Sequence, residues 1–135
     1  MVDPVWHELR DLVHSKQFQQ AAALLVGNPR LVSLTNGAGK TVLHDLAVAN
    51  EIDGVAWLHA HGFDLDTQNR LGVPLVFEVA QSGHKELLLW LKQAGANFQA
   101  VDGEGNAIID YLRRINTDEV REMIEFVSGL FLPDS

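Results

Sequence analysis

The feature that most constrains this sequence is a pattern that returns every 33 residues. Gly39, Gly72 and Gly105 stand at this spacing, and each follows an Asn or Asp by three residues. A period of this length indicates one supersecondary unit per repeat, and such units stack because none can bury its apolar face alone. Other positions in the same register are Trp57 and Trp90; Leu58, Leu91 and Ile124; Gly62 and Gly95; and Asn50, Gly83 and Asn116.

Each unit contains two short stretches with the apolar spacing of a helix. In the first complete unit these stretches are residues 41–48 and 52–61, and Gly62 is typical of the glycine that ends a helix. The second helix of the last unit is expected to begin within residues 116–119, where asparagine precedes acids that the helix dipole favours. Trp57 and Trp90 occur in the second helices beside apolar neighbours, so we expect both to be substantially buried.

The sequence therefore predicts a single all-α domain over residues 1–135, an α-solenoid of about four helix–loop–helix units with eight main helices. Shifting the register back gives a degenerate first unit over about residues 5–35, with helices at 6–13 and 18–26. This unit is glutamine-rich, as the solvated outer face of a terminal repeat requires. The other units span residues 36–68, 69–101 and 102–131.

Three pieces of the sequence resemble the ankyrin-repeat family. They are Gly-x-Thr-x-Leu-His at residues 39–44, Gly-His at 83–84 and Gly-Ala-Asn at 95–97. The resemblance covers residues 36–131 well and residues 5–35 weakly. It implies the ankyrin fold and a role in binding another protein.

The chain departs from the family pattern at three positions. Val42 stands where the family usually has proline, and Phe77 and Asp110 stand where it has a histidine. His44 keeps the position of that histidine, which in the family ties neighbouring turns together. Because of these departures, we expect irregular turns in the third and fourth units.

Composition narrows the possible chemistry. The net charge of −8 disfavours nucleic acid and favours a neutral or basic protein partner. The chain has no cysteine, which excludes disulfides, thiolate metal sites and a cysteine nucleophile. No apolar window is long enough for a membrane span, and no secretory signal is recognisable, so we expect no membrane partner and a cytoplasmic location.

Some local patterns resemble nucleotide-binding or metal-binding motifs, but their residues are better explained by their positions in the repeat. Residues 34–41 resemble a phosphate-binding loop, but Leu34 replaces its opening glycine and no strand precedes it. The histidines lack zinc-ligand spacing, and Asp64-x-Asp66 lacks the remaining ligands of a calcium loop. We therefore expect no catalytic residue, no metal site and no cofactor; an uncharacterised enzyme is the alternative from another class.

The resemblance implies that a partner contacts the turn tips and the ends of the first helices. Arg70 and Leu71 are the expected anchors, because a planar cation and an apolar side chain share one tip. The candidate partner-binding residues are Lys40, Val48, Arg70, Leu71, Val73, Gln81, Ser82, Glu104, Asn106 and Arg114, with Gly37, Ala38, Ala49, Gly103 and Ile115 beside them.

The predicted function is that of a non-enzymatic protein–protein interaction module. Small size and acidity favour a stoichiometric inhibitor or immunity protein of a basic enzyme or toxin. An adaptor or assembly scaffold is the alternative. The acidic last helix, around Glu119 and Glu122, is the alternative docking face.

Overall fold

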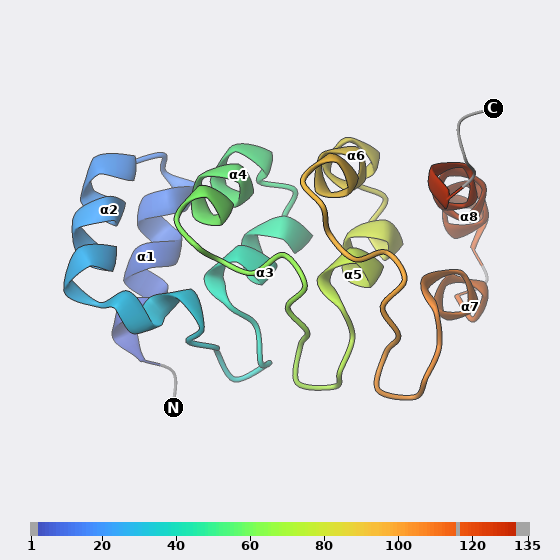
Figure 1. Ribbon diagram of the computed structural model, residues 1–135, viewed down its shortest axis with the longest axis horizontal. Helices are drawn as coiled ribbons and strands as arrows, with labels where there is room; N and C mark the ends of the chain where they lie inside the picture. Colours follow the sequence, from blue (N-terminus) through green and yellow to red (C-terminus); the bar gives the residue numbers. More distant parts are fainter. Residues whose placement is uncertain (1–2, 116, 132–135) are drawn as a thin grey trace.

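The computed structural model describes residues 3–115 and 117–131. Within these ranges the chain forms eight α-helices in four consecutive pairs, which lie side by side in chain order (Figure 1). The predicted all-α solenoid is thereby confirmed. None of the helices in these ranges is long and apolar enough to span a bilayer. The helices are α1 (Pro4–His14), α2 (Phe18–Gly27), α3 (Val42–Val48), α4 (Ile52–Ala60), α5 (Leu75–Gln81), α6 (Lys85–Gln93), α7 (Ile108–Arg113) and α8 (Asp118–Phe131), with a short 3-10 helix, η1 (Pro29–Val32), after α2.

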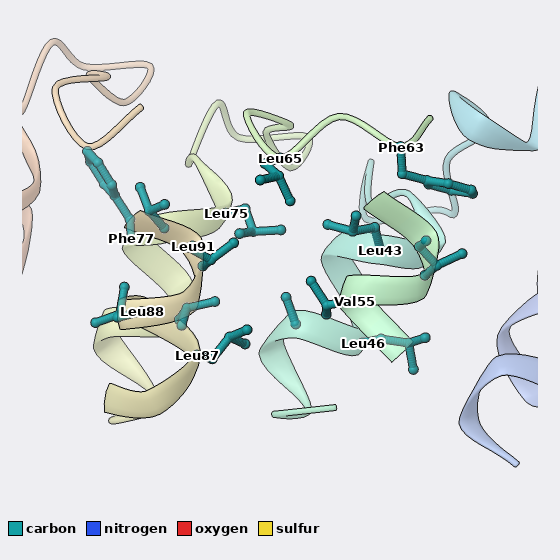
Figure 2. Close-up of a cluster of buried hydrophobic side chains, with 14 of the residues drawn as sticks. Leu43, Leu46, Val55, Phe63, Leu65, Leu75, Phe77, Leu87, Leu88 and Leu91 are labelled. Atoms are coloured by element: carbon teal, nitrogen blue, oxygen red, sulfur yellow. The ribbon is translucent and has the colours of Figure 1, made fainter. Parts of the chain in front are cut away.

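The core repeats with the sequence register. Two positions of the first helix in every unit are fully buried, including those of the degenerate first unit, so α1, α3, α5 and α7 pack on one another in sequence. The second helices add further leucines, and Figure 2 shows Leu87 and Leu91 of α6 on the side that faces α3 and α4. The two repeated core positions are Leu9, Val42, Leu75 and Ile108, and Val13, Leu46, Val79 and Leu112.

The two repeated tryptophans pack against the core, as predicted, but neither is one of the fully buried residues that form it. Trp57 on α4 and Trp90 on α6 are half-buried and pack against the core from outside. The adjacent residues Leu58 and Leu91 take the inward position. Because neighbouring helical residues point about 100° apart, the indoles take a different direction from these leucines: Trp57 stacks on Phe18 of α2, with ring centroids 5.4 Å apart, and Trp90 meets His59 of α4 edge-on at 5.8 Å.

The three long turns are regular, contrary to the expectation for the third and fourth units. We call them tip 1 (residues 36–40), tip 2 (69–73) and tip 3 (102–106). In each, the glycine has a φ between 78° and 85°, a left-handed backbone conformation that glycine adopts more readily than other residues. In each, the side-chain oxygen of the leading Asn or Asp accepts hydrogen bonds from the amides two and four residues on. These features are independent of the missing histidines, so Phe77 and Asp110 leave the turns unchanged.

The last helix begins close to its predicted start. Asn116, the first expected capping residue, lies outside the described residues. Thr117 provides a cap, because its Oγ1 accepts a hydrogen bond of 3.2 Å from the amide of Val120. Asp118 and Glu119 occupy the first turn of α8, as predicted.

Candidate partner-binding surface

The three tips project from the same side of the solenoid and pack against one another (Figure 1). The amide of Arg70 donates a 2.8 Å hydrogen bond to the carbonyl of Ala38, which joins tip 2 to tip 1. A Cβ atom added at Gly39 would lie 2.4 Å from the nitrogen of Arg70, and one added at Gly72 would lie 3.0 Å from the Cα of Gly103. Backbone therefore meets backbone at both junctions.

Lys40 is not a free tip residue. Its Nζ lies 3.2 Å from Oε2 of Glu78 on α5, and its carbonyl accepts a 3.1 Å hydrogen bond from the indole of Trp6. Glu78 also contacts Nε2 of His44 at 3.0 Å and accepts a 2.6 Å hydrogen bond from the side chain of Asn69. One carboxylate thus connects tip 1, the leading residue of tip 2 and the buried histidine of α3.

The surroundings of Glu78 keep this carboxylate charged. Burial raises its pKa, but the hydrogen bond and charge of His44, together with the charge of Lys40, outweigh burial and lower the pKa to about 2. His44 itself is fully buried. Across the described part of the chain, no three His, Asp or Glu side chains gather as a metal site would require.

An open hollow of about 380 Å³ lies between tips 2 and 3. Leu71 stands at its edge with 80% of its surface exposed, and Val73 and Ile115 add apolar surface. Polar residues bridge the rim: the hydroxyl of Tyr111 donates a 2.6 Å hydrogen bond to Gln81. A second bridge, 2.9 Å long, joins Arg114 to Glu104.

The hollow unites half of the predicted binding residues: Leu71, Val73, Gln81, Glu104 and Arg114. The others are dispersed. Lys40 is held by Glu78, and Val48 is half-buried with its carbonyl bound to His84 at 2.8 Å. The side chain of Asn106 donates back to Asp102 within tip 3, and Ser82 lines a different depression beside α8. Arg70 is exposed on tip 2, and within the described ranges its guanidinium makes no hydrogen bond or ion pair.

Sequence reasoning missed Tyr111 and Asp102 as members of the site. Tyr111 lies in the middle of α7 rather than at a tip or a helix end, where the candidates were sought. An available signal was its register position, which holds Asp45 and Glu78 in the preceding units. Two acids and a tyrosine at one repeated position of an otherwise apolar helix indicate a surface rather than the core.

Acidic side chains act on Tyr111, which lines the hollow. Burial raises the pKa of the Tyr111 hydroxyl, and the charges of Glu78 and Asp102 raise it further. Asp102 remains ionised, because the amide of Asn106 lowers its pKa against the effect of desolvation, and the Asn106 side chain, the amide of Glu104 and the charge of Arg114 lower it further. Apolar side chains and the ionised carboxylate of Asp102 therefore line the same hollow.

Helix pairs stacked in one direction, with turns that project along one edge, define a repeat solenoid whose tips present a continuous surface. Residues 43–91, from α3 to α6, match the model of the family described as ankyrin repeats (many copies). This part of the chain is thus similar to ankyrin repeats, in agreement with the resemblance of the sequence. Ankyrin repeats are generally modules for protein–protein interaction and are generally not enzymes.

Proposed function

We propose that this protein binds a protein partner, without catalysis, through tips 2 and 3. The observation that carries the proposal is the exposure of Leu71, 80% of whose surface is open at the edge of a partly apolar hollow. Covering a leucine side chain removes apolar area from water and contributes about 1.5–3 kcal/mol. Arg70 beside it offers a planar group that can form paired hydrogen bonds with a carboxylate or carbonyl oxygens.

The rigidity of tip 2 also supports this proposal. Asn69 accepts hydrogen bonds from the amides of Leu71 and Val73, and Arg70 is bonded through its amide to Ala38 of tip 1. A backbone that is already held in place loses less conformational freedom when a partner binds its side chains. Leu71 is therefore a better anchor than an equally exposed residue on a loose loop.

The test replaces Arg70 and Leu71 together by alanine. The melting temperature should stay nearly unchanged, and binding to the partner captured by the wild-type chain should weaken by about 2 kcal/mol or more in calorimetry. The matched control is Val26→Ala on α2, an equally exposed apolar residue on a different face (83% exposed). Unchanged affinity in the folded double variant would place the interface elsewhere, first at α8 around Glu119 and Glu122.

The acidity of the chain supports a finer proposal, a stoichiometric inhibitor or immunity protein of a basic enzyme or toxin. Residues 41–69 contain five acids and neither lysine nor arginine, which favours rapid encounter with a positive surface. Raising the salt concentration should then slow association more than it accelerates dissociation. An inhibitor would suppress the activity of its partner at a one-to-one ratio, whereas the alternative, an adaptor or scaffold, would bind and leave that activity intact.

A further inference from the structure

We propose that the hollow between tips 2 and 3 receives the side chain of a lysine or arginine of the partner protein, and that Asp102 selects for the positive charge. This inference rests on the proposed function, since it assigns the chemistry of the group that tips 2 and 3 bind. Both features that it uses, an apolar wall and a charged acceptor, belong to the same hollow.

The wall suits the stem of a long basic side chain. Leu71, Val73 and Ile115 supply apolar surface along the hollow, and lysine and arginine bury their methylene groups on such surfaces while the charged end stays at a polar site. Tyr111 adds an aromatic ring, which attracts a cation placed over its face. A carboxylate side chain would meet the same wall but would be repelled by the charge of Asp102.

The charges around the hollow favour a cation. Arg114 is positively charged and would repel an incoming lysine or arginine, but its guanidinium is bound to Glu104 at 2.9 Å. This pair therefore contributes little net charge. The charge of Glu78 is similarly offset by Lys40 at 3.2 Å. Asp102 forms no ion pair of this kind: within the described ranges its side chain accepts hydrogen bonds from amides of tip 3 and from the side-chain amide of Asn106. Arg114 acts on Asp102 through its charge, which lowers the pKa of that carboxyl, but its guanidinium is bound to Glu104. Of the three charged residues that line the hollow, Asp102 is therefore the one that no ion pair offsets.

The chain itself offers the variant that tests Asp102. Asn36 and Asn69 hold the same register position in tips 1 and 2, and their side-chain oxygens make the same turn hydrogen bonds. Asp102→Asn should thus remove the charge and keep the turn. The matched control is Asp64→Asn, which also removes one charge and keeps an acceptor for the amide of Asp66, at a loop outside the hollow.

The experiment titrates the isotope-labelled full chain with N-acetylarginine amide and with its neutral analogue, N-acetylcitrulline amide, and follows the backbone amide signals by NMR. For probes of this size we expect dissociation constants on the order of millimolar. The arginine probe should shift the amides of Leu71, Gly103 and Tyr111 saturably and bind about threefold more tightly than the citrulline probe. This preference should disappear in Asp102→Asn and persist in Asp64→Asn.

Equal binding of the two probes, a preference that survives Asp102→Asn, or shifts confined to other surfaces would each overturn the inference. The proposed function is tested separately with the partner. If the Arg70/Leu71 double variant loses partner binding while Asp102→Asn and Asp64→Asn bind alike, the tips bind a partner but the hollow does not select a cation. If the double variant binds normally, the proposed function itself fails, whatever the probes do.

Discussion

Tips 1 and 2 have the same backbone and different surfaces. In both, an asparagine oxygen accepts two amide hydrogen bonds and a glycine takes a positive φ. Between these fixed residues tip 1 carries Gly37 and Ala38, whereas tip 2 carries Arg70 and Leu71. The comparison separates two tasks: the Asn and Gly build the turn, and the residues between them decide whether the turn offers anything to a partner.

The support beneath the two tips differs as well. The carbonyl of Lys40 in tip 1 accepts the indole N–H of Trp6, and the ammonium of Lys40 is drawn to Glu78. The equivalent residue of tip 2 is Val73, which lines the hollow instead. Tip 1 therefore connects neighbouring units through Lys40, whereas tip 2 presents two exposed side chains, those of Arg70 and Leu71.

The largest expected effect on the free energy of unfolding follows from removing the indole of Trp6, which is bound to the carbonyl of Lys40 in tip 1. This side chain is 2% exposed, so Trp6→Ala should destabilise the fold by about 3–5 kcal/mol in urea unfolding. Trp90→Ala is the matched comparison; because Trp90 is only half-buried, its loss should be about 1–2 kcal/mol. Equal losses for the two variants would contradict the distinction between a core indole and an outer one.

A second effect concerns the junction between tips 1 and 2. Gly39→Ala should destabilise the protein by about 2–4 kcal/mol, because the residue has a φ of 78° and its Cβ would collide with the backbone of Arg70. Gly37→Ala is the control in the same tip, where a Cβ has open space around it. A thermal melt in which both variants resemble the wild type would show that the tips are not packed backbone to backbone.

A third effect is the dependence of stability on pH that Glu78 introduces. Its pKa is about 2 in the folded protein against an ordinary value of 4.5, so its stabilising effect is complete above about pH 4.5 and is lost as the pH falls towards 2. The loss should amount to about 3 kcal/mol. Glu78→Gln should remove this part of the acid transition in urea unfolding at a series of pH values. The control variant, Glu86→Gln at an exposed glutamate, should keep this part of the acid transition.

Much of the fold could be predicted because the same pattern of helices and turns recurs in every 33-residue unit. Any single glycine or leucine is ambiguous, but the 33-residue register fixes the order of helices and turns and makes the inner positions of all units equivalent. The register does not predict how deeply a repeated residue is buried, because burial depends on how each helix is rotated about its own axis. Trp57 and Leu58 repeat equally well, and only the packed structure decides which of two adjacent side chains faces inward.

The site could be predicted less well than the fold. The register placed Leu71 and Arg114 on the same edge of the solenoid, but it could not show that Lys40 is bound to Glu78, since this contact spans 38 residues and two units. Nor did it include Tyr111, because the positions carried over from the family describe tips and helix ends. Such contacts depend on how neighbouring units lie on each other, which a one-dimensional period does not encode.

The smallest effect on stability, and the sharpest test of the comparison, is an exchange between the two tips. Ala38 and Leu71 share one register position, so Leu71→Ala gives tip 2 the residue of tip 1 and Ala38→Leu does the reverse. Both residues are exposed, and each change should alter the free energy of unfolding by less than about 0.5 kcal/mol. A loss above about 1 kcal/mol for Leu71→Ala would mean that this leucine folds back on its own loop and stabilises the chain rather than a complex. With the partner, Leu71→Ala should weaken binding, whereas Ala38→Leu should not restore binding in the Leu71→Ala background, because the hollow that receives the partner lies between tips 2 and 3.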